Sequence, residues 1–144
     1  MAHDTLLKFN YPATLLHEYR HWAVLLRPKQ VTLGSLVLAC TEDATSMADV
    51  TPAAFAELKT VTTELENTLR AAFTYDKINY ICLMMVDKQV HFHVLPRYAA
   101  PRSCCGQTFV DAKWPTPPDV TQAVDLSDAQ FTELLALLRS RWPR

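Results

Sequence analysis

The most regular hydrophobic pattern in the 144-residue sequence lies between residues 52 and 73. Large apolar residues recur there at intervals of three or four, namely Phe55, Leu58, Val61, Leu65, Leu69 and Phe73. An α-helix repeats at about this interval, so the spacing puts all of them on one face. Thr51 and Pro52 supply an N-cap hydroxyl and a proline at the first helical position. The pattern therefore predicts an amphipathic helix over residues 52–73.

Short apolar runs bounded by turn-forming residues predict four strands, over residues 22–26, 35–40, 77–85 and 89–95. A loop over residues 27–34, which contains Pro28 and Gly34, separates the first pair of strands. Only residues 86–88 separate the second pair, so we expect a hairpin there. Residues 15–19, just before the first strand, are expected to form a short helical segment.

Prolines are frequent after the last of these strands. We expect an irregular, proline-rich arm over residues 99–125, and then a helix that begins at Ser127, where Gln130 completes a capping box. The predicted order of elements gives an α+β fold, in which one antiparallel sheet is combined with a long helix and a C-terminal helix. The length fits a single domain over residues 1–144.

Polar side chains alternate with apolar ones in the strand predicted over residues 89–95. Gln89, His91 and His93 would share one face of the sheet, and the apolar residues between them would pack against a helix. Alternate residues of a strand lie roughly 6.5–7 Å apart, so a chain of phosphates could lie along this row. Two other interpretations stay open: strand histidines without a role, and a His-x-His metal site that lacks a third ligand.

Charge and glycine content narrow the classes of function. Lys and Arg total 14 and Asp and Glu total 15, and this net charge of −1 argues against a nucleic-acid partner. The two glycines, Gly34 and Gly106, are too few for a glycine-rich phosphate loop, so side chains would have to hold any phosphate. No apolar run approaches the ~20 residues of a membrane span, and residues 1–12 lack the basic and apolar regions of a signal peptide, so we expect none. We therefore expect a cytoplasmic protein without a membrane partner.

Two further patterns carry less weight. The four cysteines contain no C-x-x-C pair, and Cys104 and Cys105 are adjacent, which does not suit a disulfide framework, so we expect reduced thiols. The segment His17–His21 formally matches the H-E-x-x-H zinc motif, which requires a helix and a third ligand. Since a strand begins directly afterwards at Trp22, we interpret this match as coincidental and expect no metal site and no resident cofactor.

The segment from Gln89 to Arg97, Gln-Val-His-Phe-His-Val-Leu-Pro-Arg, resembles the signature of the histidine triad (HIT) superfamily, His-φ-His-φ-His-φ-φ, where φ is apolar. The order of predicted elements and the turn at residues 32–35 agree with this resemblance, which points to the Fhit-like dinucleoside polyphosphate hydrolases and their bacterial relatives. It implies a HIT-like fold, a homodimer, and a small-molecule nucleotide substrate cleaved through a nucleotidyl-histidine intermediate. A divalent cation would enter only with the polyphosphate substrate.

The resemblance also assigns roles to individual residues. His91 would attack the α-phosphorus, and His93 would stabilise charge on the phosphate oxygens. Gln89 takes the place of the first histidine and would act as a neutral hydrogen-bonding partner, because an amide cannot deliver a proton to a leaving group. The remaining substrate contacts that the resemblance implies are Arg27, Gly34 and Arg97.

The missing first histidine leaves two hypotheses. In the first, the protein is a nucleotide phosphohydrolase or nucleotidyl transferase that prefers phosphoanhydride bonds, since a polyphosphate leaves as a stabilised anion and an amine does not. In the second, it is a nucleotide-binding or sensing protein with weak or no turnover. A covalent adduct formed on turnover would separate the two.

Overall fold

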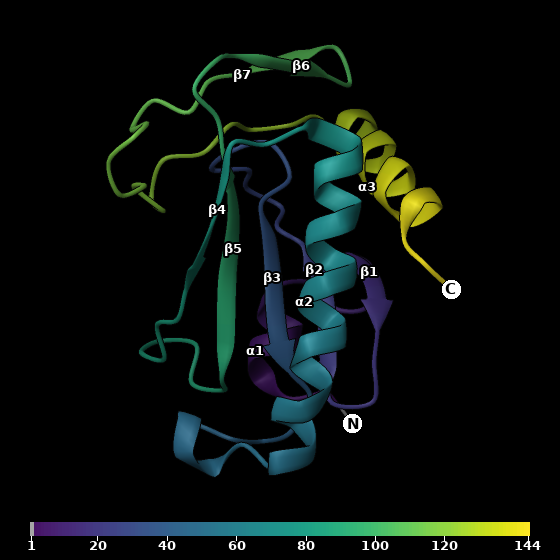
Figure 1. Cartoon of the computed structure of the whole chain (residues 1–144), viewed down its shortest axis with the longest axis vertical. Coiled ribbons are helices and arrows are strands. Elements are labelled where there is room, and N and C mark those ends of the chain that lie inside the picture. The colour runs from purple at the N-terminus through teal and green to yellow at the C-terminus, as the bar shows by residue number, and fades with distance from the viewer. Residues whose placement is uncertain (1) are drawn as a thin grey trace.

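A five-stranded antiparallel sheet forms the centre of the molecule, with its strands in the order β1-β2-β3-β5-β4 (Figure 1). The computed structural model describes residues 2–144. The strands span Leu15–Glu18 (β1), Trp22–Leu26 (β2), Leu36–Cys40 (β3), Lys77–Ile81 (β4) and His91–Arg97 (β5). Helix α2 (Pro52–Phe73) crosses one face of the sheet, and α3 (Asp128–Arg141) lies beside α2. The predicted α+β class, with a long helix and a C-terminal helix, is therefore confirmed.

Helix α2 spans the residues that the hydrophobic pattern predicts. The Thr51 hydroxyl accepts a hydrogen bond from the backbone N–H of Ala54 at 3.3 Å, and Thr74 ends the helix in the left-handed conformation at φ 51°. Phe55 is 42% exposed, however, and Ala54 is the buried residue near the helix start. The reason is that the Trp22 indole donates a hydrogen bond to the Ala54 carbonyl at 2.7 Å and packs beneath this turn.

Residues 15–19, expected to be helical, instead contain the edge strand β1. This strand pairs antiparallel with β2, and Glu18 lies opposite Ala23. The carbonyl of Leu15 also accepts a hydrogen bond from Arg139 of α3 at 2.8 Å. Tertiary contacts therefore decide the conformation of a segment whose local preference is weak.

The connection between β4 and β5 is longer than the predicted hairpin. It runs over residues 82–90 instead of residues 86–88. Val90 donates its N–H to the carbonyl of Ala44 at 2.8 Å, and its carbonyl accepts from the N–H of Cys40 at 3.0 Å. These bonds tie the end of the connection to the chain after β3, so it does not continue the pairing with β4.

The proline-rich arm contains a regular hairpin. Its two strands are β6 (Arg102–Cys104) and β7 (Gln107–Phe109). The turn consists of Cys105 and Gly106, with φ angles of 56° and 72°. Two successive positive φ angles match the twist of a two-residue hairpin turn, so the expectation of an irregular arm is wrong for residues 102–109. Arg102 fastens the hairpin to the end of α2 by donating to the carbonyl of Thr74 at 3.0 Å.

Three helical elements complete the description. α3 has the predicted capping box, in which the side chains of Ser127 and Gln130 each bond to the backbone of the other residue. Helix α1 (Asp4–Lys8) and the 3-10 helix η1 (Met47–Asp49) were not predicted. No helix within residues 2–144 has both the length and the hydrophobicity needed to cross a membrane.

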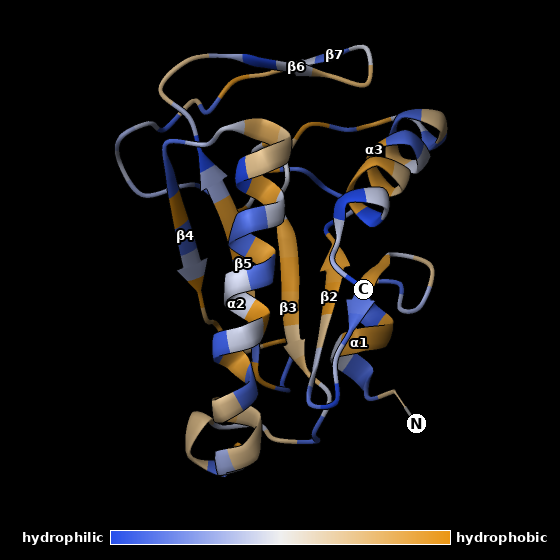
Figure 2. Cartoon of the chain, turned by 45° about the vertical axis from the view of Figure 1, so that its right-hand side comes forward, coloured by the Kyte–Doolittle hydropathy of each residue, from blue (hydrophilic) through white to orange (hydrophobic). Residues whose placement is uncertain are grey.

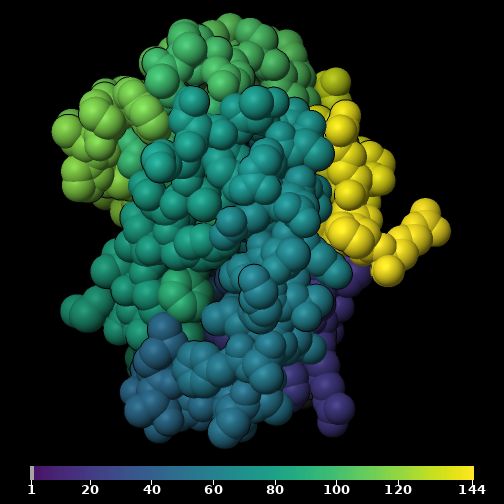
Figure 3. Space-filling model, in the orientation of Figure 1, coloured from purple at the N-terminus to yellow at the C-terminus, as the bar shows by residue number. Residues whose placement is uncertain are grey.

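The two faces of the sheet carry different structures. On one face lies the main hydrophobic core, and α2 packs over it, running down the middle of the molecule in front of the sheet (Figures 2 and 3). On the other face, Leu6 of α1 packs against a small cluster that comprises Ala23, Leu25, Val37 and Ala39. Helix α1 and the turn after it therefore cover the middle strands from the side opposite α2.

Candidate active site

His91 and His93 lie side by side on the face of the sheet that α1 covers. In the sheet register they stand opposite Ala39 and Val37, which belong to the cluster beneath α1. The two imidazole centroids are 5.2 Å apart, and the ring planes are inclined at 83°. The intervening Phe92 packs against the core on the α2 side. The predicted separation of histidines from apolar residues is therefore confirmed within β5.

A backbone carbonyl fixes the tautomer of His91. Nδ1 of this ring lies 2.8 Å from the carbonyl oxygen of Gln89. Because a carbonyl oxygen can only accept a hydrogen bond, Nδ1 carries the proton in this pair. The lone pair of the neutral ring is then on Nε2, which is the arrangement that a nucleophilic imidazole needs.

His93 is uncharged at neutral pH. Burial, and after it the positive charge of Arg27 and the neighbouring His91, lower the pKa of His93 to about 4. Nδ1 of His93 is buried and has no hydrogen-bond partner within residues 2–144. Leaving a buried polar nitrogen without a partner costs free energy. His93 therefore offers an unused hydrogen-bonding group directly beside His91.

Arg27, which follows β2, lies close to the histidine pair. Its charge acts on the pKa of His93, and its guanidinium donates to the carbonyls of Lys29 at 2.6 Å and Val120 at 3.2 Å. Nε of Arg27 is buried without a partner in the described part of the chain. Burial lowers the pKa of Arg27, although a guanidinium stays charged in proteins at neutral pH. Arg27 thus adds a fixed positive charge next to His93.

Phe9, which the sequence analysis did not single out, lies over both histidines. The centroid of its ring is 5.8 Å from that of His91 and 5.7 Å from that of His93. Beside it is a cavity of about 340 Å³, lined by Lys8, Phe9, Asn10, Arg27, Pro28 and Lys29. This cavity adjoins the histidine pair and combines three cationic side chains with an aromatic ring.

Gln89 lies just before β5 and not within it as predicted, and its side chain lies against α1, which covers the face of the sheet that carries His91 and His93. Its side-chain oxygen accepts hydrogen bonds from the hydroxyl and the backbone N–H of Thr5 at 2.6 and 3.2 Å. Its side-chain nitrogen donates to Oδ1 of Asp43 at 2.9 Å. The side-chain amide of Gln89 therefore holds α1 over the site, and its backbone carbonyl is the group that contacts His91.

Gly34 lies on the other side of the sheet and is not brought to the histidines. It has φ 85°, and a Cβ atom at this position would lie 3.0 Å from Cε2 of Phe73. Its N–H donates to the side-chain oxygen of Gln30 at 2.8 Å. Gly34 thus shapes the turn between β2 and β3, and its contact with a nucleotide stays a prediction.

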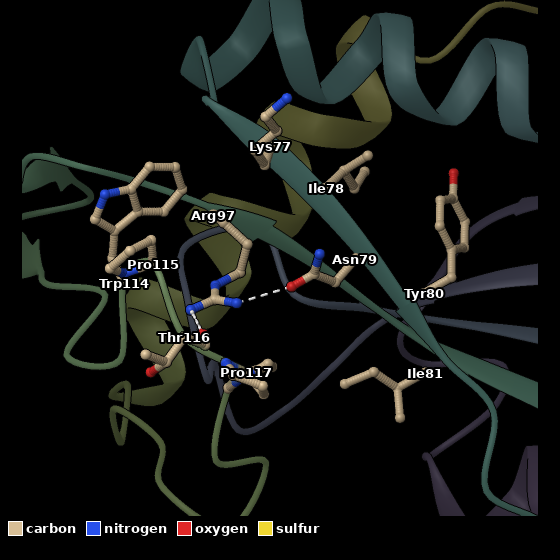
Figure 4. Close-up of a pocket in the computed structure, with 11 residues that line it drawn as sticks. Lys77, Ile78, Asn79, Tyr80, Ile81, Arg97, Trp114, Pro115, Thr116 and Pro117 are labelled. Carbon is tan, nitrogen blue, oxygen red and sulfur yellow. Dashed lines mark hydrogen bonds between the residues drawn. The ribbon is translucent and has the colours of Figure 1, made fainter.

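Arg97 fastens the arm to the sheet (Figure 4). It forms a two-pronged ion pair with Asp111 at 2.7 and 3.0 Å, and it also donates to the Asn79 side chain and to the carbonyl of Thr116, both at 2.8 Å. The side chains of the ion pair are 4% and 3% exposed. These partners occupy the guanidinium of Arg97, and its contact with substrate stays a prediction.

The zinc motif of the sequence does not form a metal site. His17 belongs to β1 and not to a helix, and its ring stacks on Trp142 with centroids 6.3 Å apart. His21 instead lies 3.3 Å from a carboxylate oxygen of Glu42. Within residues 2–144, no group of three or more His, Cys, Asp or Glu side chains is placed to hold a metal ion.

Comparison with known proteins agrees with this geometry. The model of the HIT domain family matches residues 10–100, which include His91 and His93. The chain belongs to the HIT domain family. Two solved HIT structures superpose over most of their length. A histidine triad protein from Bradyrhizobium japonicum has a TM-score of 0.76 and 21% identity, over 99% of this chain and 97% of that one. A histidine triad protein from Marinobacter aquaeolei VT8 has a TM-score of 0.76 and 21% identity, over 99% of this chain and 95% of that one.

A third HIT neighbour is more distant. It is a hypothetical histidine triad nucleotide-binding protein from Sulfolobus tokodaii strain7, with a TM-score of 0.68 and 14% identity over 95% of this chain and 88% of that one. At such identities the likeness shows the HIT fold and nothing finer. A search of curated protein sequences gives no match.

Proposed function

We propose that this HIT protein is a nucleotide phosphohydrolase or nucleotidyl transferase that cleaves phosphoanhydride bonds of dinucleoside polyphosphate-like substrates through a nucleotidyl-histidine intermediate. The observation that carries the proposal is the 2.8 Å hydrogen bond from Nδ1 of His91 to the carbonyl of Gln89. In the neutral form of His91 this bond puts the lone pair on Nε2, and the ring lies beside an uncharged His93 and a fixed cation, Arg27.

The reaction takes place in two steps. In the first, Nε2 of His91 attacks the α-phosphorus, a P–N bond forms, and the bond from phosphorus to the bridging oxygen of the leaving polyphosphate breaks. The carbonyl of Gln89 stabilises the positive charge that develops on the ring, since it accepts the Nδ1–H bond. In the second step, water attacks phosphorus and loses a proton to solvent, while the P–N bond breaks and releases the neutral ring.

The surroundings of His91 fit an anionic, aromatic substrate. His93 has one ring N–H, which can donate to a non-bridging phosphate oxygen, and Arg27 supplies a permanent positive charge. We place the nucleoside in the 340 Å³ cavity, with its base against Phe9. Lys8 and Lys29 at the same cavity can meet further phosphates of the chain.

The leaving group sets the substrate preference. The side-chain amide of Gln89 is bound to Thr5 and Asp43 and has no acidic proton to give. A polyphosphate departs as a stabilised anion, whereas an amine needs a proton as it departs. Turnover of a phosphoanhydride should therefore exceed turnover of an adenosine phosphoramidate. Equal or faster cleavage of the phosphoramidate would contradict this part of the proposal.

The decisive experiment is a rapid-quench reaction with a diadenosine polyphosphate. We expect an adenylylated peptide containing His91 that is stable in alkali and labile in acid, followed by release of the mononucleotide. The variant His91→Ala should form neither adduct nor product, and His17→Ala, altered on β1 outside the site, should react like the parent. Product formation by His91→Ala would refute the nucleophile. Tight binding with neither adduct nor product would favour the sensing function.

The homodimer is a further part of the proposal. β4 is an edge strand, and a cavity of about 860 Å³ lies between it and arm residues 114–118 (Figure 4). In the connection that follows β4, the side chains of Leu83, Met85 and Val86 are 51%, 80% and 84% exposed. An unpaired edge beside exposed apolar residues suits pairing with a second copy. Sedimentation should give twice the monomer mass for the parent and the monomer mass for a Met85→Glu/Val86→Glu variant.

A further inference from the structure

Two adjacent cysteines meet at the tip of the β6–β7 hairpin. Sγ of Cys104 and Sγ of Cys105 are 3.2 Å apart, and both thiols are free. Neither residue is fully buried, and both lie at the margin of the main core. The pair lies in the arm outside β5, and neither the HIT motif nor the proposed reaction uses it.

The backbone at this turn does not favour a cysteine. Cys105 has φ 56° and occupies the first central position of the two-residue turn, with Gly106 at φ 72° in the second. Turns with two positive φ angles prefer Asn, Asp or Gly at the first position, because other side chains are strained there. A side chain of the wrong type at a strained position indicates a function for that side chain.

We propose that Cys104 and Cys105 form a reversible dithiol–disulfide redox site that reacts with hydroperoxides. Two thiols held at this separation need only a small sulfur movement to form a bond. Two other cysteines provide an internal comparison. Cys40 is buried in β3, and Cys82 lies against Met84, with 3.1 Å between their sulfur atoms, so neither has a second thiol as a neighbour.

The reaction balances with hydrogen peroxide as the oxidant. Burial, and after it the hydrogen bond and charge of Cys104, raise the pKa of Cys105 to about 12, so Cys105 keeps its proton at neutral pH. The sulfur of Cys104 attacks the peroxide oxygen, the O–O bond breaks, and a sulfenic acid and one water form. The sulfur of Cys105 then displaces the hydroxyl group from Cys104. The S–S bond forms and a second water leaves.

The geometry also explains why the bond would be easy to reduce. Consecutive Cα atoms lie about 3.8 Å apart across a trans peptide bond, which is closer than the roughly 4.4–6.8 Å of an ordinary disulfide. A disulfide between neighbours is therefore strained, and strained disulfides are the readily reduced, regulatory ones. The pair suits cycles of oxidation and reduction and does not suit a permanent cross-link.

The test is oxidation of the folded full-length protein with one equivalent of hydrogen peroxide, followed by intact-mass and peptide analysis. We expect the loss of two hydrogen atoms in the peptide that contains Cys104 and Cys105, a fall in free thiols from the four of the reduced protein to two, and reversal by glutathione. Closure in the folded protein should be roughly tenfold or more faster than in urea-unfolded protein, because the fold holds the sulfurs together.

Variants separate the pair from a chance oxidation. With Cys105→Ser, the sulfenic acid on Cys104 should persist and be trapped by dimedone, whereas Cys104→Ser should give none. Cys105→Asn keeps a residue suited to the turn and should abolish the two-hydrogen loss without unfolding the chain. Oxidation that begins at Cys82, a disulfide between two copies, or closure that is no faster in the folded protein would each overturn the proposal.

Discussion

The side-chain oxygen of Gln89 accepts two hydrogen bonds from Thr5, a residue 84 positions earlier in the chain. The contact is reciprocal, because the backbone N–H of Gln89 donates to the Thr5 hydroxyl at 3.2 Å. It joins α1 to the residue whose carbonyl orients His91. Gln89 thus both holds in place the segment that carries Phe9 over the histidines and sets the tautomer of the proposed nucleophile.

The first prediction concerns the Gln89–Asp43 contact. Gln89→Glu replaces a donor by a second carboxylate beside Asp43, so it should destabilise the protein by about 1–2 kcal/mol at pH 7. The double variant Gln89→Glu/Asp43→Asn restores a donor and an acceptor and should recover most of the loss. Urea denaturation of the parent, the two single variants and the double variant measures the coupling. Additive effects would show that the contact contributes nothing.

The second prediction concerns pH. The pKa of His93 is lowered from 6.5 to about 4 in the folded protein. Between these values the unfolded chain binds a proton that the folded chain does not, so this contribution to stability is present above pH 6.5 and is lost as the pH falls toward 4. His93→Asn should flatten the pH dependence of the unfolding free energy in this range. An unchanged slope in His93→Asn would refute the assignment.

The third prediction concerns the buried Arg97–Asp111 pair. Asp111→Ala leaves the guanidinium without its main partner and should cost about 3–5 kcal/mol. Replacing both residues, as in Arg97→Met/Asp111→Leu, should cost less than either single change, since no buried charge is left behind. Lys8→Gln removes one member of the exposed pair with Asp87, which is 3.5 Å long, and should change stability by less than about 1 kcal/mol. Thermal unfolding compares all of them.

The fourth prediction compares the two glycines. Gly106 has φ 72° with open space around its Cα, so Gly106→Ala should cost about 1 kcal/mol through the backbone alone. Gly34 has φ 85°, and a Cβ atom added there would lie 3.0 Å from the ring of Phe73. Gly34→Ala therefore adds a steric clash to the backbone strain and should cost about 2–4 kcal/mol. Chemical denaturation gives both values, and similar costs would contradict the steric argument.

Local signals were enough for part of the fold. α2 and the start of α3 could be predicted because caps and apolar spacing act within a few residues, as at Thr51 and Ser127. The conformation of residues 15–19 could not, because it follows from pairing with β2. The β6–β7 hairpin was missed because Cys105 is not a residue that normally signals its turn.

The sequence likewise predicted only some of the residues of the candidate site. His91 and His93 could be found because strand alternation puts them on one face. Phe9 and Thr5 could not, because they lie far away in the sequence and have no motif. The ion pair of Arg97 with Asp111, 14 residues later in the arm, could not be predicted either, because no local sequence pattern indicates it. Long-range contacts of this kind are visible only in the folded chain.

The docking of α1 has a consequence for protein synthesis. Residues 3–9 leave the ribosome well before residues 89–93, which contain the partners of Thr5 and Phe9. Leu6 can pack against residues 23–39 earlier, but Phe9 lacks both histidine rings until β5, the last strand of the sheet in chain order, has been made. The nascent chain therefore completes the site only when residues 5–9 pack against β5.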